Sequence, residues 1–180
     1  MTEKEKMLAG ENYSAADPEL TVQRAHARRL SRIYNDQPDH KILTKLLGSC
    51  PDEVTIEPDF KCDYGSNIHL GENFYANFDL TILDVCEVRI GNHCLIGPNV
   101  GIYTASHPID RIERRSGAEF GASITIGDDC WIGGHAVINP GVTLGDNVIV
   151  ASGAVVTKSF GDNVLLAGVP AQVIKKLEPG

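Results

Sequence analysis

The stretch IGDDCWIGGHAVINPGVTLGDNVIVASGAVV (residues 126–156) carries an aliphatic residue at every sixth position. The same step runs through residues 90–102, and residues 70–88 repeat it with an offset of two residues. A period of six fits neither an α-helix, at about 3.6 residues per turn, nor an isolated strand, at about 2. We therefore predict a solenoid in which each hexad is one short strand plus a turn, and three hexads form one coil of a triangular prism.

The residue that follows each aliphatic is usually glycine or another small or polar type, as in Gly91, Gly127 and Gly145. Glycine at such a position serves either a turn with positive φ or a close approach of two backbones. The aliphatic side chains are expected to point inward and stack between coils, which leaves no deep pocket inside the prism. Any chemistry must then come from side chains at the corners, in ejected loops or between subunits.

The composition is that of a folded protein with an acidic surface. Of 180 residues 22% are charged, and the formal net charge of −8 disfavours a surface for nucleic acid or for an anionic membrane. No apolar run approaches the roughly 18 residues that span a bilayer, and the N-terminus lacks the plan of a signal peptide. We expect a cytoplasmic protein. Its five cysteines form no CxxC pair and are interpreted as reduced structural thiols.

The pattern divides the chain into three regions. Residues 1–50 lack the hexad and are expected to form an N-terminal helical cap. Residues 51–167 form the prism, interrupted at 108–123 by a polar loop, which we interpret as an arm lying over a neighbouring surface. Residues 168–180 are expected to cap the other end with a short C-terminal helix.

The N-terminal region has clear helix signals. Asp17 is suited to an N-cap and Pro18 to the first helical position, so we predict a helix from about Pro18 to Tyr34. A second, shorter helix opens after Pro38. The first helix carries a basic stripe, which is either a solvated face or has a role near an acceptor site. The stripe consists of Arg24, Arg28, Arg29 and Arg32.

Motifs around the hexads carry a resemblance to a known family. They are KMLAGENY (6–13), DYGSN (63–67), NFYANF (73–78), YTASHP (103–108) and AGVPA (167–171). Together with the hexads, they resemble the hexapeptide-repeat acyltransferases, in the branch of maltose and galactoside O-acetyltransferases with their nodulation-type relatives. The maltose-type enzymes are the closer match.

This resemblance implies a mainly β fold, the left-handed parallel β-helix. It also implies a homotrimer with active sites between subunits. The implied activity is direct transfer of an acetyl group from acetyl-CoA to a hydroxyl of a sugar such as maltose, glucose or a galactoside, without a metal.

The transfer needs a base for the attacking hydroxyl and a donor for the tetrahedral oxyanion. A histidine suits the first task because its unperturbed pKa is about 6.5. By position alone His107 reads as a corner histidine bonded to backbone, and by the resemblance it is the general base. Asn77 by itself fits a left-handed turn. The resemblance makes it a residue that supports the transition state and contacts the acyl donor.

Coenzyme A is strongly anionic at its nucleotide end and needs cationic or N–H partners. Without the resemblance, Lys158 and Lys175 are solvated surface charges. Trp131 is expected to project outward, where it either packs under a neighbouring arm or lines the pantetheine channel. By family position the coenzyme is lined by Gly134, Ser152, Thr157, Lys158 and Lys175.

Four residues are candidates for the acceptor. Asp63 falls where relatives place a sugar-contacting polar residue, and Tyr75 shares a motif with Asn77. Asp84 lies where the hexad register slips by two residues, which could aim its carboxylate outward. Asp17 is either the N-cap already named or an acceptor-binding acid. For each aspartate the alternative is a surface or turn residue.

Two other functions fit the same solenoid. A zinc carbonic anhydrase needs three converging histidines. His93 and His135 are seven hexads apart, and because seven is not a multiple of three they should fall on different faces. A non-catalytic trimeric scaffold is the other alternative, and the intact His107 and coenzyme motifs argue against it.

Overall fold

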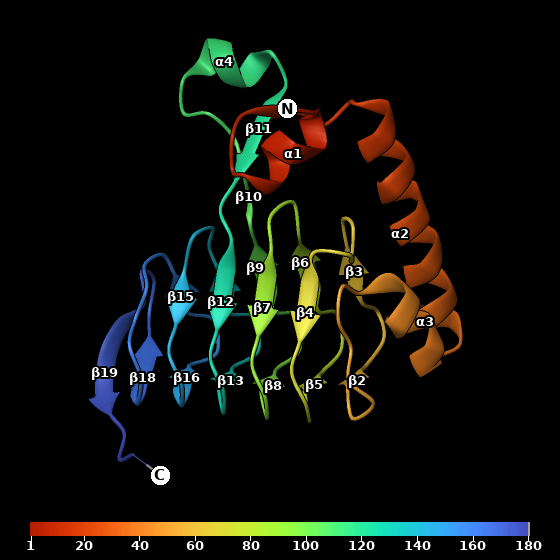
Figure 1. Ribbon diagram of the computed structural model, residues 1–180. Helices are drawn as coiled ribbons and strands as arrows, with labels where there is room; N and C mark the ends of the chain where they lie inside the picture. The colour runs from red at the N-terminus through yellow and green to blue at the C-terminus, as the bar shows by residue number, and fades with distance from the viewer. Residues whose placement is uncertain (180) are drawn as a thin grey trace.

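The computed structural model describes residues 1–179, and most of them form a prism of stacked parallel strands. The prism winds left-handed around a horizontal axis in Figure 1, as the family resemblance implied. Its three faces are three sheets. The four-stranded sheet holds β4 (Ile68–Leu70), β7 (Val88–Ile90), β12 (Ile124–Ile126) and β15 (Thr143–Leu144).

The other two faces continue each coil. The seven-stranded sheet holds β2 (Thr55–Ile56), β5 (Tyr75–Ala76), β8 (Leu95–Ile96), β13 (Trp131–Ile132), β16 (Val148–Val150), β18 (Val164–Ala167) and β19 (Gln172–Lys176). The five-stranded sheet holds β3 (Lys61–Cys62), β6 (Thr81–Leu83), β9 (Gly101–Tyr103), β14 (Val137–Ile138) and β17 (Val155–Val156).

The core is a stack of inward side chains, two from each hexad. In β12, Ile124 and Ile126 are buried and Thr125 between them is exposed. Strand register places Ile126 beside Ile90 in one neighbouring coil and beside Leu144 in the other. Such contacts replace the core of a globular domain. Four of the five free thiols are buried, and partial burial raises the pKa of the fifth, Cys50, to about 11, so the predicted structural role of the cysteines holds.

Three corners join the three sheets, and glycine is needed there where the backbones of neighbouring coils approach each other closely. The first corner leads from the four- to the seven-stranded sheet, the second from the seven- to the five-stranded sheet, and the third back to the four-stranded sheet. At the first corner, a Cβ on Gly127 would lie 2.6 Å from the carbonyl carbon of Gly145 in the next coil. Positive φ falls two residues later in the turn, as at His93 (56°) and Asp129 (56°).

The third corner explains the slip in the hexad register. Ile82 and Ile90 are both inward core residues, yet they are eight positions apart instead of six. The two extra residues lie in the connection from β6 to β7. The connection from β3 to β4 is equivalent by register, since Cys62 pairs with Ile82 and Leu70 with Ile90. The interruption after residue 106 falls at this corner too. The first three coils therefore depart from the repeat at one shared edge of the prism.

Helices cover the N-terminal end of the prism (Figure 1). The predicted first helix is α2 (Pro18–Asp36), two residues longer than expected, and the second is α3 (His40–Leu46). Leu30 and Leu43 from these helices join the core. A helix that the sequence did not reveal, α1 (Glu3–Leu8), precedes them and begins with a capping box between Thr2 and Glu5. Among residues 1–179 no helix is long and apolar enough to cross a membrane.

The arm and the C-terminus differ from expectation in their local structure. Residues 108–123 contain α4 (Arg111–Arg115) and β11 (Ala118–Gly121), and β11 pairs with β10 (Ala105–Ser106) and with β1 (Tyr13–Ser14). The arm and the N-terminal segment thus stand together above the prism (Figure 1). The predicted short C-terminal helix is wrong. Residues 172–176 form β19, antiparallel to β18, because an edge strand at the end of a solenoid needs a partner for its backbone groups.

Candidate active site

The third corner forms one wall of a cavity of about 280 Å³. The opposite wall is α2, and the arm closes the top through β11. The cavity brings together side chains that are far apart in the sequence, among them Arg28, Asp63, Tyr64, His107 and Glu119. Two of the sequence-predicted residues, Asp63 and His107, therefore share one site in a single chain.

One ring nitrogen of His107 makes a hydrogen bond, and the other has no partner among the described residues. The imidazole is exposed, and Nδ1 lies 3.3 Å from the carbonyl oxygen of Ala118. Ala118 is placed there by the antiparallel pairing of β10 with β11. A carbonyl oxygen only accepts hydrogen bonds, so the contact requires a proton on Nδ1, and in the neutral ring the lone pair then lies on Nε2. The contact is the backbone bond expected of a corner histidine, and it leaves Nε2 without a partner among the described residues.

Asp63 supplies a carboxylate to the same cavity. It is half-buried directly after β3. Burial raises the pKa of its carboxyl above the usual value, and the positive charges of Arg28 and Arg24 act in the opposite direction. A carboxylate in this position can accept hydrogen bonds from hydroxyl groups of a polar ligand.

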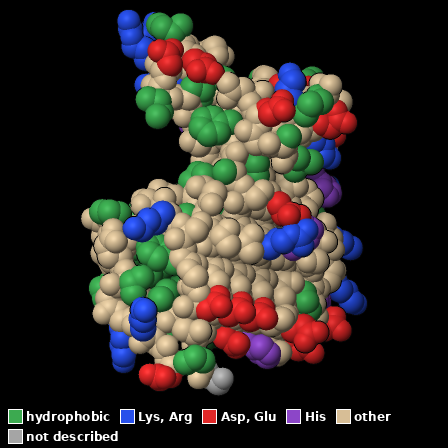
Figure 2. Space-filling model, turned by 60° about the vertical axis from the view of Figure 1, so that its left-hand side comes forward, with side chains coloured by type: hydrophobic (Ala, Val, Ile, Leu, Met, Phe, Trp, Pro, Cys, Tyr) green, Lys and Arg blue, Asp and Glu red, His purple; other side chains and the backbone are tan. Residues whose placement is uncertain are grey.

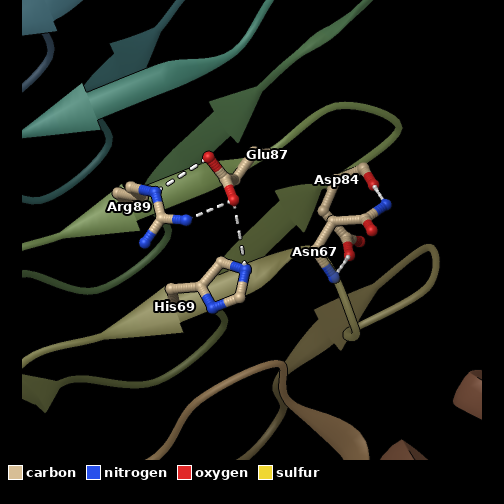
Figure 3. Close-up of polar contacts among 5 residues, drawn as sticks. All are labelled: Asn67, His69, Asp84, Glu87 and Arg89. Atoms are coloured by element: carbon tan, nitrogen blue, oxygen red, sulfur yellow. Dashed lines mark hydrogen bonds and ion pairs between the residues drawn. The ribbon is translucent and has the colours of Figure 1, made fainter. Parts of the chain in front are cut away.

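The prediction that Asp84 points outward to the acceptor is wrong, because its side chain points inward. It has no exposed surface, and its Oδ1 accepts hydrogen bonds from the backbone N–H of Asp63 (3.0 Å) and Tyr64 (2.9 Å). Asn67 binds it twice, donating its backbone N–H to Oδ2 and its side-chain amide to the Asp84 carbonyl oxygen at 2.7 Å (Figure 3). The extra residues of the corner form a tight loop whose amides need an acceptor. Burial raises the pKa of Asp84 to about 7.

Asp17 has the structural role that its position suggested. Its Oδ1 accepts hydrogen bonds from the backbone N–H groups of Glu19 (2.9 Å) and Leu20 (3.3 Å), which caps α2. The side chain does not line the cavity that contains His107.

The cavity also contains Glu119, which no sequence pattern identified, and Arg24 of the predicted basic stripe. Glu119, from β11, accepts a hydrogen bond from the Tyr13 hydroxyl at 2.9 Å. Arg24 of the basic stripe donates to the Tyr64 hydroxyl at 2.7 Å and to the carbonyl oxygen of Ala15 at 2.6 Å. Glu119 and Tyr13 meet only because the arm pairs with the N-terminal segment. No periodicity in the sequence marks that pairing.

The second corner carries a separate group of candidates. Asn77, Gly134 and Ser152 follow β5, β13 and β16, each in its own coil. Asn77 does not occupy the left-handed turn expected from its type, since Asp79 has the positive φ (61°). Its side-chain oxygen accepts the N–H of Phe78 at 2.8 Å, so its amide N–H₂ group remains available as a donor.

The outer face of the seven-stranded sheet adjoins this corner. Tyr75, Leu95 and Trp131 lie in register on consecutive strands. Trp131 projects outward as predicted, with 53% of its surface exposed. Lys175 lies on β19 of the same sheet. These side chains form a partly apolar strip along the prism.

The remaining coenzyme candidates are at the third corner, in the last coil. Thr157 and Lys158 follow β17 and are exposed, and the Lys158 ammonium lies 5.5 Å from the centre of the Phe160 ring. The candidates thus divide between two corners of the prism. His107 and Asn77, in particular, lie on different edges of the prism within one chain.

The histidines considered for a metal do not converge. His93 lies at the first corner and His135 at the second, as the count of hexads predicted. Over the described part of the chain, no three His, Cys, Asp or Glu side chains are grouped so that they could hold a metal ion.

Comparisons with known proteins agree with this architecture. Residues 6–51 match the maltose acetyltransferase hexapeptide capping motif. Residues 123–158 match the bacterial transferase hexapeptide (six repeats), and residues 87–109 the hexapeptide repeat of succinyl-transferase.

Solved structures and curated relatives resemble the chain over nearly its full length. The structure of a maltose O-acetyltransferase from Clostridium difficile is 47% identical, with a TM-score of 0.97 over 99% of both chains. A hexapeptide-repeat acetyltransferase from Vibrio cholerae, complexed with acetyl coenzyme A, is 36% identical, with a TM-score of 0.93 over 99% of this chain and 100% of that one. The galactoside O-acetyltransferase of Escherichia coli is 38% identical over 96% of this chain and 88% of its own length.

Proposed function

We propose that this chain, which belongs to the hexapeptide-repeat acetyltransferases of the maltose and galactoside type, moves an acetyl group from acetyl-CoA to a sugar hydroxyl. The observation that carries the proposal is the state of His107. Its Nδ1–H is engaged by the Ala118 carbonyl, and its Nε2 is free beside a polar cavity large enough for a sugar ring. A neutral imidazole held in this tautomer is suited to take a proton from an attacking hydroxyl.

The reaction follows from that geometry. Nε2 of His107 takes the proton as the sugar oxygen bonds to the thioester carbonyl carbon. The Ala118 carbonyl stabilises the imidazolium that results. The amide N–H₂ group of Asn77 donates to the oxyanion of the tetrahedral intermediate. When the C–S bond breaks, the imidazolium returns the proton to the leaving thiolate of coenzyme A.

An acyl-enzyme has no evident carrier. Burial raises the pKa values of the Cys62 and Cys86 thiols, which disfavours the thiolate needed for attack. A hydrogen bond with Cys94 lowers the pKa of Cys130, but that thiol is buried in the core of the prism. No cysteine lines the cavity that contains His107 among the residues described. Direct transfer within a ternary complex is therefore the proposed route.

A homotrimer would unite the two groups of candidates. In a closed three-fold assembly, the third corner of one subunit faces a different edge of its neighbour. His107 of one subunit could then meet Asn77 of another. The arm leaves a hollow between itself and the C-terminal coils (Figure 2). It also exposes 96% of Ile109 and 57% of Ile112, which is apolar surface suited to contact with a partner.

Coenzyme A would lie along the same junction. Trp131 and the small residue Gly134 offer a surface for the pantetheine arm, and Ser152 and Thr157 offer hydroxyl donors. Lys158 and Lys175 are exposed cations at the C-terminal end of the prism, where they fit the anionic nucleotide end. For the acceptor, Asp63 and Glu119 provide carboxylates for sugar hydroxyls, and Tyr75 lies beside Asn77.

The proposal is tested by following thiol release from acetyl-CoA with glucose, maltose, galactosides and amino acceptors. We expect turnover with at least one sugar and none that depends on added zinc. Turnover confined to amino acceptors would refute the sugar assignment. A folded protein without turnover on any acceptor would instead be a scaffold.

A mixing experiment tests the position of the site between subunits. His107→Ala and Asn77→Ala chains, each with little activity alone, are co-expressed in equal amounts. If one site takes His107 and Asn77 from different chains, random assembly leaves about a quarter of all sites intact, one in each mixed trimer, and activity returns. If both residues serve the site from one chain, mixing restores nothing.

A further inference from the structure

A second hollow, the α2 groove, lies between α2 and the five-stranded sheet and has a volume of about 450 Å³. It adjoins the cavity of His107, because Arg28, Asp63 and Leu83 line both. A ligand that enters the cavity can therefore extend beneath α2 without leaving the surface of the protein. Apart from the shared Asp63, no residue of this groove has a role in the proposed acetyl transfer.

Helix α2 is fixed along residues 60–64 by polar contacts near its two ends. Near the N-terminal end, Arg24 donates to the Tyr64 hydroxyl at 2.7 Å. Near the C-terminal end, Asn35 exchanges two hydrogen bonds of 2.9 Å with the backbone of Phe60. These contacts set the width of the groove, so it is a feature of the folded chain.

Two guanidinium groups line the groove between those contacts. Arg28 and Arg32 are one helical turn apart, and within residues 1–179 neither has a hydrogen bond or an ion pair. Like charges four residues apart destabilise a helix. The third cation of the groove, Lys61, is already paired with Asp79 at 3.1 Å. Arg32 therefore brings to the groove a positive charge that has no ion pair among residues 1–179, whereas the charge of Arg28 also acts on the carboxyl of Asp63.

We propose that the α2 groove binds an acidic substituent of the acceptor, a carboxylate or phosphate, while the sugar hydroxyl to be acetylated lies at His107. This inference rests on the proposed function and names the class of its acceptor. The carboxylate of Asp63 repels an anion at the junction of the two hollows. The anion is therefore assigned to the Arg32 end, about 6 Å further along the helix. The half-buried Leu83 contacts the connecting part of the ligand.

Two matched acceptors test the assignment. They are the 4-carboxyphenyl glycoside of the best sugar from the acceptor panel and its neutral methyl ester. For the native enzyme we expect kcat/KM to be about tenfold higher for the carboxylate, through KM, as for a charge-assisted hydrogen bond at a partly exposed site. Arg32→Gln should remove the preference and leave the ester unchanged.

Arg29→Gln is the matched control. Arg29 is exposed on the same helix and does not line the groove, and within residues 1–179 its side chain has one hydrogen bond, to His26 at 3.2 Å. Its replacement removes the same charge and should leave the preference intact. Equal kcat/KM for the two acceptors in the native enzyme, or an equal loss in both variants, overturns the groove assignment alone. Absence of turnover with every sugar overturns the proposed function itself.

Discussion

The backbone N–H groups at the first and third corners of the prism both need side-chain acceptors, and the two corners supply these acceptors in different ways. At the first corner, a side-chain oxygen from each successive coil accepts a backbone N–H from the coil before it, and in the later coils this oxygen belongs to a carboxylate. Asp146 accepts from Asp128 at 2.8 Å, and Asp162 accepts from Asp146 at 2.9 Å. The side chains lie at the surface, and acidic groups follow the lower edge of the prism in Figure 2.

At the third corner the accepting carboxylate is buried. Asp84 accepts the amides of Asp63 and Tyr64 from the preceding coil, as the first-corner aspartates do. The two extra residues of this connection turn Asp84 inward and leave Asp63 facing the cavity. One coil later, the same corner ejects the arm and holds His107. One corner of the repeat thus serves stability and another carries the residues proposed for chemistry, and the two corners differ in the length of their connections.

The largest expected effect is the loss of the base at the third corner. His107→Ala should lower kcat by about 10²–10⁴-fold, the range for general-base catalysis, while the thermal midpoint hardly moves because the ring is exposed. The measurement is steady-state thiol release with saturating acetyl-CoA.

The matched control is His93→Asn at the first corner. Asparagine tolerates the positive φ of 56° at this position, so the turn is kept. Turnover should be close to native. A large loss in this variant, or near-native turnover in His107→Ala, would break the division between a chemical and a structural corner.

The second largest expected effect is a loss of stability when a side chain is added where neighbouring coils approach closely at the first corner. In Gly127→Ala the new Cβ would lie 2.3 Å from the Asp146 carboxylate oxygen and 2.6 Å from the backbone of Gly145. We expect a loss of about 3 kcal/mol in the free energy of unfolding, the upper range for overpacking, because backbone must move.

Gly161→Ala is the control, since Gly161 has the same place in the last coil and a Cβ added there would have no atom within 4 Å. Its effect should stay within about 0.5 kcal/mol. Both values come from denaturant unfolding monitored by circular dichroism. Similar losses in the two variants would mean that turn conformation, not contact between coils, requires the glycine.

Because of Asp84, the stability that the third corner contributes should depend on pH. Its pKa is raised to about 7 in the folded protein, above the value of about 3.9 expected when unfolded, so the fold favours the protonated form. Stability from this group is then complete below about pH 4 and is lost as the pH rises through 7. Relative to Asp84→Asn, which does not titrate, the native protein should lose about 2 kcal/mol between pH 5 and pH 8.

Unfolding free energies at several pH values provide the measurement. If the curves of the native protein and Asp84→Asn run parallel, the carboxyl at the third corner is not shifted upward.

The hexads predicted the prism because period six admits few other architectures. The predicted outward position of Trp131 and the burial of the cysteines follow from the same register. The register also located the third corner, since the slip before Ile90 and the gap after His107 are visible as departures from the period. It did not show that the extra residues turn Asp84 inward, because spacing carries no information on which amides lack an acceptor.

Other features depend on contacts that no local pattern encodes. Glu119 and Tyr13 are 106 residues apart and meet only through the pairing of β11 with β1. The sequence predicted a helix where β19 lies. The strand forms because the edge of β18 needs a partner, and residues 172–176 themselves do not show that need. The α2 groove likewise arises from the docking of a helix whose basic stripe, taken alone, reads as a solvated face.

The smallest expected effect concerns the far end of the third corner. Lys158 is exposed, and its ammonium is held 5.5 Å from the Phe160 ring, so it can meet a phosphate without being desolvated. An exposed ion pair contributes little, so Lys158→Gln should raise KM for acetyl-CoA only about threefold to tenfold and leave kcat unchanged. The effect should shrink in high salt, since screening weakens exposed charge pairs. Lys45→Gln, at the end of α3, removes the same charge at the opposite end of the prism and should leave KM unaltered. Equal changes in the two variants would mean that net charge attracts the coenzyme, and that the third corner contributes to chemistry only where its connections are long.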